Sequence, residues 1–247
     1  MKRLFNWQFT FALVLVLLSV VFYFIHYLIF RDLHHIFLYL IGDIAFLFVN
    51  VLIVMLVLQR LLVYRDKQSM LKKLNMVIGT FFSEVGTELL KILSDFDPKA
   101  SDIAQQLVVT KDWSKKDFLR VGRKIRTHQS DINSKKESLD QAKIFLISKR
   151  PFLLTLLENP NLLEHETFTD LLWAVFHLTD ELAHRTDLRK LPDSDYEHLA
   201  GDIKRAYHQL LIQWLEYMKH LKHDYPYLFS LAIRTNPFDP NASVEVK

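Results

Sequence analysis

The sequence predicts an all-α protein, in which a two-helix transmembrane hairpin precedes a cytoplasmic helical bundle of about six or seven helices. Three observations carry this prediction: two long apolar runs near the N-terminus, a scarcity of helix-breaking residues, and amphipathic segments throughout the rest of the chain. Only 5 Gly and 7 Pro occur in 247 residues, which favours helices over a turn-rich all-β fold. We divide the chain into a transmembrane hairpin (1–65), a helical domain (66–234) and a C-terminal tail (235–247).

The two apolar runs are each long enough to cross a bilayer once. The spans are predicted at about 9–30 and 36–59, and Asp43 is the one acidic residue inside them. A hydrocarbon core requires about 20 apolar residues of helix, and backbone groups in lipid must bond within their own segment. Because the first run is longer than the apolar region of a secretion signal and a second run follows at once, an uncleaved anchor is expected.

Basic residues are in excess only at the ends of the predicted spans that lie away from the connection 31–35. Lys2 and Arg3 precede the first span, whereas the connection 31–35 carries one Arg that Asp32 balances. The basic residues that follow the second span, and that we expect to contact lipid headgroups, are Arg60, Arg65, Lys67, Lys72 and Lys73. Since positive charge marks the cytoplasmic side, both termini are expected in the cytoplasm. The protein is then a multi-pass protein of the cell (plasma or inner) membrane.

Three polar residues lie within the predicted spans. Asp43 and Asn50 are seven residues apart and share one face of the second helix, and His26 of the first helix lies at a similar depth. A hydrogen bond or ion pair between His26 and Asp43 is therefore expected to be within reach. Two interpretations stay open: polar contacts between the helices of a hairpin or oligomer, or an ion or proton path built by several hairpins.

The body is expected to be helical from residue 66 onward. Capping boxes are predicted at Ser114, Ser134 and Ser194, Thr167 is predicted to cap a further helix, and Pro151 is expected to interrupt another. The helix over about 66–97 is expected to continue from the second span as one long rod. Further helices are expected at about 101–107, 115–128, 135–149, 152–158, 167–185, 195–223 and 227–233.

Five side chains of the body have spacings compatible with metal binding: Glu84, Glu88, His177, Glu181 and His184. Glu181-x-x-His184 has the spacing of half a di-iron carboxylate site, but the sequence lacks a matching second half. The nearest match, Asp195-x-x-His198, lies near a helix start. The competing interpretation is structural: the glutamates bridge to basic neighbours, and the polar side of helix 167–185 faces solvent or a partner. Trp173 on that side indicates a contact with a partner.

Three blocks of the sequence, 74–86, 156–177 and 225–231, resemble a family of small prokaryotic two-span membrane proteins with a cytoplasmic helical domain. The resemblance covers most of the chain. It implies a prokaryotic cell membrane and brings no activity, ligand or catalytic residue with it.

The sequence contains no phosphate-binding loop, dinucleotide glycine pattern, nucleophile elbow or zinc-protease motif. The net charge of +3 is too small to indicate nucleic acid binding. No Cys occurs, which excludes disulfides and thiolate metal sites, and no cofactor is expected. We predict a membrane-anchored interaction, scaffold or regulatory protein without catalytic activity, in contact with the bilayer and with a second copy or a protein partner. The alternatives are an oligomeric channel or transporter accessory subunit and a metal-dependent helical-bundle enzyme.

Overall fold

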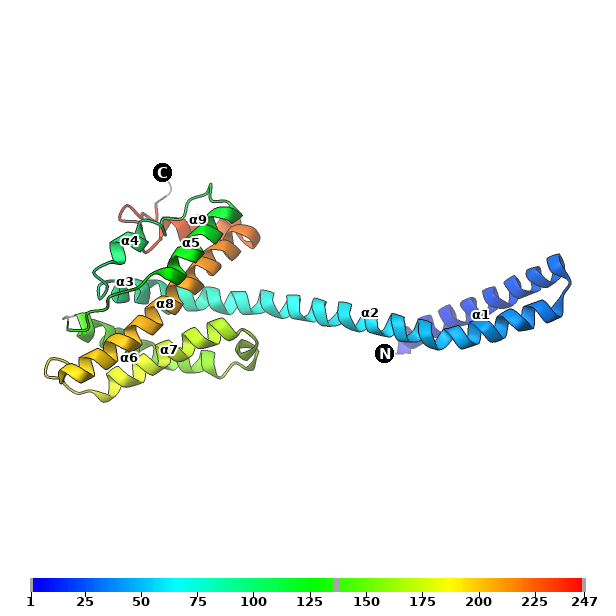
Figure 1. Ribbon diagram of the computed structural model, residues 1–247, viewed down its shortest axis with the longest axis horizontal. Helices are drawn as coiled ribbons and strands as arrows, with labels where there is room; N and C mark the ends of the chain where they lie inside the picture. The colour runs from blue at the N-terminus through cyan, green and yellow to red at the C-terminus, as the bar shows by residue number, and fades with distance from the viewer. Residues whose placement is uncertain (1, 136–137, 246–247) are drawn as a thin grey trace. The chain divides into compact units, whose positions relative to one another are not determined.

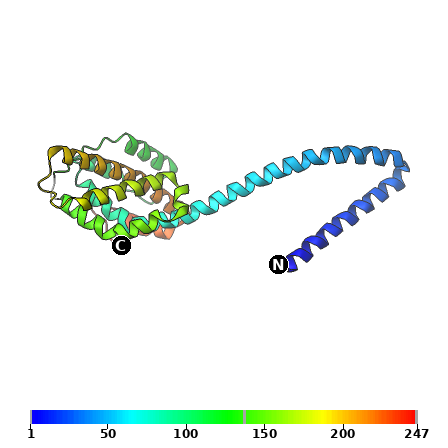
Figure 2. The ribbon, with the colours of Figure 1, turned by 90° about the horizontal axis from the view of Figure 1, so that it is seen from below.

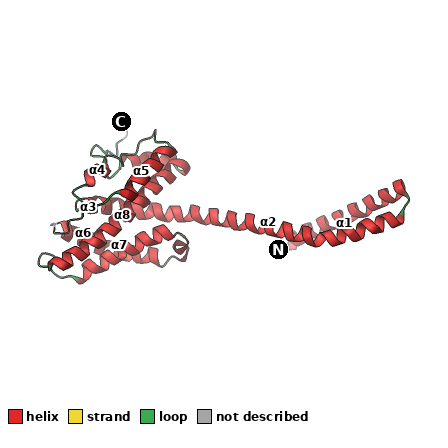
Figure 3. Ribbon diagram, in the orientation of Figure 1, coloured by secondary structure: helices red, strands yellow, loops and turns green. Residues whose placement is uncertain are grey.

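The computed structural model describes residues 2–135 and 138–245, without the side chains of 2–6, 8, 71–73, 138, 163 and 164. The described ranges consist of helices and loops and contain no strand (Figure 3). The all-α prediction is therefore confirmed. The chain forms two compact units, Met1–Lys67 and Gln68–Lys247.

The elements are, in chain order, α1 (Lys2–Phe30), α2 (Leu33–Phe81), a π-helical turn (Phe82–Gly86), α3 (Thr87–Ser94), α4 (Ala100–Ala104), α5 (Lys115–Thr127), α6 (Ser138–Leu157), a 3₁₀ turn (Pro160–Glu164), α7 (Glu166–His184), α8 (Asp193–Asp224) and α9 (Pro226–Arg234) (Figure 1).

Helices α1 and α2 of the first unit are joined by a two-residue turn, which is shorter than the connection 31–35 expected from the sequence. Arg31 has a φ of 50°, and its N–H donates to the Tyr27 carbonyl over 2.8 Å, a common way to end a helix. Asp32 Oδ1 accepts from the His35 N–H over 3.2 Å and caps the start of α2. The second helix therefore starts at Leu33 and not at residue 36.

The apolar side chains of the first unit face outward. Two helices are long and apolar enough to cross a membrane, one over Phe9–Phe30 and one that starts at Leu33, and none of the apolar window in either is buried. Such a surface is far larger than the apolar patches that soluble monomers expose.

The expected pair between His26 and Asp43 is absent from the described residues. Asp43 is exposed, and the His26 ring lies instead 6.3 Å from the His35 ring and 4.7 Å from Phe30. Because α2 starts earlier than predicted, His35 and not Asp43 lies opposite His26 near the turn.

The second unit is arranged around α8. This helix packs against α3, α5, α7 and α9, and it lies between α5 and α7 in both views (Figure 1 and Figure 2). Its side chains Tyr207, Leu210 and Leu211 are fully buried. The wide apolar stripe that the sequence shows over this helix is thus the centre of the core.

Helix caps were predicted less well than the helices themselves. At α5 the expected capping box is present: Ser114 Oγ accepts from the Asp117 N–H, and Asp117 Oδ2 accepts from the Ser114 N–H. At α7 the cap is His165 and not Thr167, since His165 Nδ1 accepts from the Phe168 N–H over 3.2 Å.

The predicted cap at Ser194 is wrong, and the one at Ser134 involves a residue outside the described ranges. Ser134 is buried and donates its hydroxyl to the Tyr196 carbonyl over 2.6 Å, whereas Glu137, its expected partner, lies outside the described residues. Helix α8 begins after Pro192 without a side-chain cap, so Ser194 does not form the expected box. Pro151 lies inside α6 and does not end it.

The first residues of the predicted tail pack against the helical domain. Asn236 is buried and donates to the Leu107 carbonyl over 2.9 Å. The Phe238 ring makes an edge contact with Trp214 at a centroid distance of 5.0 Å. The segment after α9 therefore closes one side of the core.

A π-helical turn separates α2 from α3 and requires a glycine at its end. The Thr87 N–H and hydroxyl both bind the Phe82 carbonyl. A Cβ at Gly86 would lie 2.5 Å from the Phe82 ring and 2.9 Å from the Phe81 ring. Both rings are buried, so neither can move aside without disturbing the core.

We expect Gly86→Ala to lower the free energy of unfolding of the helical domain by about 1–3 kcal/mol, because the added methyl group overpacks the two rings. The measurement is urea-induced unfolding of the full chain in mild detergent, followed by tryptophan fluorescence. Gly201→Ala is the matched control: a Cβ there meets nothing within 4 Å, so the substitution should stabilise by about 0.4–1 kcal/mol. Equal stability of Gly86→Ala and wild type would contradict the packing described.

Candidate functional site

Four side chains of α7 and α8 converge where the two helices lie alongside each other. His177 and Glu181 are one turn apart on α7, and His198 and Asp202 are one turn apart on α8. One imidazole nitrogen or carboxylate oxygen from each residue lies within 4.8 Å of the other three. We call these four residues the α7–α8 cluster.

The imidazole nitrogens of the cluster each approach both carboxylates. His177 Nε2 lies 3.8 Å from Glu181 Oε1 and 3.4 Å from Asp202 Oδ2. His198 Nε2 lies 3.6 Å from Glu181 Oε2 and 3.3 Å from Asp202 Oδ2. The two rings are about half exposed, so the cluster is open to solvent on one side.

The Asp202 carboxylate is the buried member of the cluster. Its side chain is 3 % exposed. Oδ1 accepts from Arg205 Nη1 over 2.9 Å, whereas Oδ2 is buried and has no hydrogen-bond partner. A buried carboxylate oxygen in this state is costly, and it is aimed at both imidazoles.

Arg185 at the end of α7 holds the cluster together from one side. It donates to the Glu181 carboxylate and carbonyl, both over 2.6 Å, and it binds both oxygens of Asp195 on α8 over 2.6 and 2.8 Å. The hydrogen bonds from the guanidinium hold the pKa of Glu181 and of Asp195 below their ordinary values, and they raise the pKa of Arg185.

The structure brings together only two of the five predicted metal-binding residues, His177 and Glu181. His184 is turned away, with Nδ1 2.7 Å from the Asp180 carbonyl. The polar side of α7 is largely exposed, as expected, at Trp173, His177 and His184, while His177 and Glu181 also face α8.

The two glutamates bridge to lysines, as the structural interpretation expected. Glu84 lies 3.2 Å from Lys149, and Glu88 lies 3.5 Å from Lys91. Neither belongs to the α7–α8 cluster.

Sequence reasoning missed His198 and Asp202. His198 was considered only as the partner of Asp195, which binds Arg185 instead. The available signal was a repeated spacing: His177-x-x-x-Glu181 and His198-x-x-x-Asp202 each place an imidazole and a carboxylate one turn apart on a helix.

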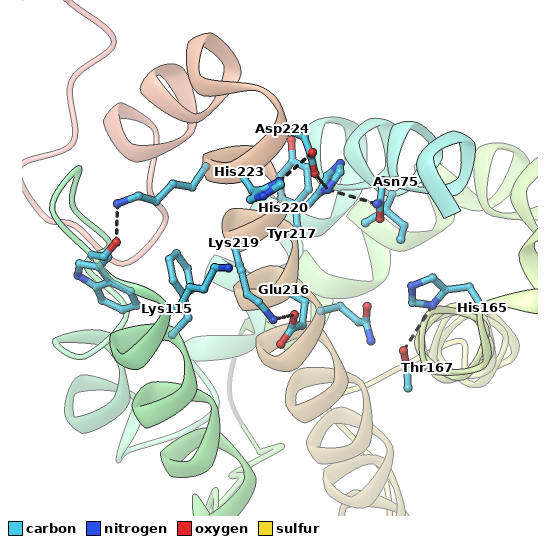
Figure 4. A pocket seen from close by; sticks show the side chains of 15 residues that line it. Asn75, Lys115, His165, Thr167, Glu216, Tyr217, Lys219, His220, His223 and Asp224 are labelled. Atoms are coloured by element: carbon cyan, nitrogen blue, oxygen red, sulfur yellow. Dashed lines mark hydrogen bonds and ion pairs between the residues drawn. The ribbon is translucent and has the colours of Figure 1, made fainter. Parts of the chain in front are cut away.

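A cavity of about 820 Å³ lies elsewhere in the second unit, between α5, α8, the end of α2 and the start of α7 (Figure 4). Its wall is rich in basic and aromatic side chains, although Lys219 is paired with Glu216 and Lys222 donates to backbone carbonyls. His220 Nδ1 lies 2.7 Å from Asp224 Oδ2, and its buried Nε2 has no hydrogen-bond partner. Burial lowers the pKa of His220, which favours its neutral imidazole.

The polar and basic residues predicted near the membrane lie on exposed surfaces. Asp43 and Asn50 are exposed on α2, and no described residue forms a hydrogen bond or ion pair with Asp43. Arg60, Arg65 and Lys67 are exposed as well. The side chains of Lys72 and Lys73 lie outside the described residues. Trp173 is 56 % exposed and makes an edge contact with Phe176.

Comparison with known proteins identifies the same two parts of the chain. Residues 2–62 match a family model described as "MJ1433, N-terminal helical domain", and residues 70–234 match one described as "Uncharacterized protein MJ1433, C-terminal helical domain". A relative from Methanocaldococcus jannaschii, described as "Uncharacterized protein MJ1433", is 45% identical over 236 residues, which are 96% of this chain and 94% of the relative. No solved structure matches. The boundary between the two units falls in the gap between the two matched regions.

We expect Arg185→Gln to lower the free energy of unfolding at pH 7 by about 1.5–3 kcal/mol, because it removes charged hydrogen bonds to two carboxylates. Both carboxylates have lowered pKa values in the folded state, so the unfolded chain binds more protons in acid. Their contribution is therefore complete above the ordinary carboxyl pKa of about 4 and is lost progressively as the pH falls below it. The difference between variant and wild type should shrink over this range in urea unfolding experiments.

Arg189→Gln is the control, since the Arg189 side chain is exposed and its one partner among the described residues is Asp140, over 3.3 Å. It should change the stability little at any pH. A difference between Arg185→Gln and wild type that is the same at pH 7 and pH 3 would contradict the role assigned to the ion pairs.

Proposed function

The chain belongs to the MJ1433 family, and we propose that it is a two-span membrane protein that holds a helical interaction domain on the cytoplasmic side. The domain binds a partner or ligand and does not catalyse a reaction. The two apolar helices form the anchor, and the second unit is the part that recognises another molecule.

The observation that carries this proposal is the exposed apolar surface of the first unit. The apolar windows of α1 and α2 are long enough to cross a bilayer, and none of their residues is buried. In water such a surface would drive aggregation. In a bilayer this surface contacts lipid acyl chains, and the helical backbone satisfies its own hydrogen bonds.

The proposed orientation rests on charge. Arg60, Arg65 and Lys67 follow the second apolar run, and Lys2 and Arg3 precede the first. Short flanks rich in Lys and Arg stay in the cytoplasm. The turn at Arg31 and Asp32 then lies on the outside, and the second unit lies inside.

The interaction role rests on two features of the second unit. Trp173 is a large exposed aromatic side chain on a folded helix, and tryptophan is enriched where proteins contact each other. The cavity between α5 and α8 offers a second place of contact, of a size that suits a small ligand.

Cysteine labelling tests the anchor, because the natural chain contains no Cys and gives no background. We expect His34→Cys, next to the turn, to react with a membrane-impermeant maleimide in intact cells. Ser243→Cys, in the C-terminal segment, should react only after the membrane is permeabilised. Wild type is the unlabelled control.

Two results would contradict the anchor and its orientation. Release of the chain from membranes by alkaline carbonate would show that it is not integral. The reverse labelling pattern, with Ser243→Cys accessible from outside, would show that the domain lies on the other side.

An oligomer built through the spans is a second candidate, favoured by the exposure of Asp43 and Asn50 on one face of α2. A carboxylate in the apolar part of a bilayer costs about 2.5–3.5 kcal/mol. No described residue of the same chain pairs with Asp43, so other copies are the available partners. Polar contacts of this kind between helices are worth about 0.6–1.7 kcal/mol each.

We expect native mass spectrometry of the detergent-solubilised chain to show an oligomer that Asp43→Leu weakens about threefold to twentyfold. Asp66→Asn, which removes a carboxylate of the same helix outside the apolar run, is the control and should leave the oligomer intact. A monomeric wild type, or an oligomer insensitive to Asp43→Leu, would remove this candidate. Ion flux into vesicles that falls with Asp43→Leu would extend it to conduction.

A further inference from the structure

We propose that the α7–α8 cluster binds one first-row divalent transition-metal ion, with Zn²⁺ the best match, and that this ion fastens α7 to α8. The inference is independent of the membrane anchor, since all four ligands lie in the second unit.

The spacing of the donor atoms suits a tetrahedral ion. Zinc binds imidazole nitrogen and carboxylate oxygen at about 2.0–2.2 Å, which sets neighbouring ligand atoms about 3.3–3.6 Å apart in a tetrahedron. The two imidazole Nε2 atoms lie 3.3 and 3.4 Å from Asp202 Oδ2, which matches a tetrahedral edge. Glu181 contributes a different oxygen to each ring, with Oε2 3.6 Å from His198 and Oε1 3.8 Å from His177. Because one donor atom from each residue lies within 4.8 Å of the other three, the side chains would close around an ion by drawing one Glu181 oxygen inward.

The buried carboxylate provides independent support for a cation. Asp202 Oδ2 has no hydrogen-bond partner although both Nε2 atoms lie within 3.4 Å of it. The imidazoles are thus placed beside this oxygen without being aligned to donate to it. A metal ion between the three atoms would satisfy the oxygen and use the lone pairs of both rings.

Two arginines beside the cluster donate hydrogen bonds to its carboxylates, as neighbouring donors fix the carboxylate ligands of metal sites. Arg185 binds Glu181. Arg205 occupies Oδ1 of Asp202 and leaves Oδ2 for the ion. Both contacts orient a carboxylate toward the space between the imidazoles.

The donor set indicates the class of ion. Two imidazoles favour a transition ion over Ca²⁺ and Mg²⁺, which prefer oxygen ligands. Four protein ligands complete a tetrahedron and leave no open position, as in structural zinc sites. The half-exposed rings of His177 and His198 give the ion a path from solvent.

The competing explanation is an ion-pair network, in which protonated imidazoles balance the carboxylates without any metal. An ion-pair network would involve the same four residues, so only a direct measurement of metal binding distinguishes it from the proposed metal site. The probe is Co²⁺, because four-coordinate Co²⁺ absorbs visible light far more strongly than the hydrated ion and is displaced by Zn²⁺.

The experiment uses the full chain in detergent, without a histidine tag and freed of metal with a chelator. We expect wild type to bind one Co²⁺ per chain with the tetrahedral spectrum, and Zn²⁺ to displace it. His198→Ala and Asp202→Asn should weaken Co²⁺ binding at least tenfold. His184→Ala is the matched control: it removes a histidine of the same helix that lies outside the cluster, and it should bind as wild type does.

Three results would overturn the proposal. Wild type without stoichiometric Co²⁺ would leave an ion-pair network only. Equal binding by His198→Ala and His184→Ala would place the ion elsewhere. An octahedral spectrum would contradict the closed four-ligand site. Because His198 is half exposed, its substitution should preserve the circular dichroism spectrum, so a loss of binding is not a loss of fold.

Discussion

The burial of α8 is the packing on which the helical domain depends. The helix is 32 residues long, and its fully buried side chains lie at the centre of the core. Helices gain most of their stability from tertiary packing of an apolar face and little from propensity. Because α8 contacts α3, α5, α7 and α9, its apolar stripe determines where each of these neighbours lies. The position of α7 beside it is one consequence.

The polar border between α7 and α8 follows from this packing. Once the apolar stripes of the two helices meet, residues at the edges of both stripes must face each other. Charged groups in such a position are stabilising only when paired. Arg185 and Arg205 satisfy most of the carboxylate oxygens there. Asp202 Oδ2 is buried and remains without a hydrogen bond, and buried unsatisfied groups in native proteins call for an explanation. A cation bound by the four side chains of the α7–α8 cluster would explain why this oxygen has no hydrogen bond.

The sequence was sufficient for properties that belong to a single helix. Residues three or four apart lie on one face of a helix, so the apolar stripe of α8 and the common face of His177 and Glu181 could be predicted. The capping box of Ser114 could also be predicted, because all its partners lie within three residues. These features need no knowledge of where other helices lie.

The remainder of the site depends on which helices are neighbours, and periodicity does not contain that information. His198 and Asp202 look like ordinary polar residues near a helix start until α8 is placed against α7. The same limit explains Ser134, whose hydroxyl donates to a carbonyl 62 residues away in the chain, a contact that no local pattern predicts. The early start of α2 had a different cause. A two-residue turn required Arg31 in a left-handed conformation, which non-glycine residues adopt rarely.

The two units differ in how much of their apolar surface they bury. The proposals of membrane insertion and of metal binding therefore rest on different parts of the chain. The second unit buries its own apolar side chains, including the aromatic pair Phe81 and Phe82. The first unit leaves the apolar windows of α1 and α2 unburied. Membrane insertion is therefore argued from a missing apolar environment, whereas metal binding is argued from a missing partner for one buried oxygen. The apolar helices of the first unit and the α7–α8 cluster share no residue. A failed test of membrane insertion therefore leaves the case for metal binding unchanged, and the reverse also holds.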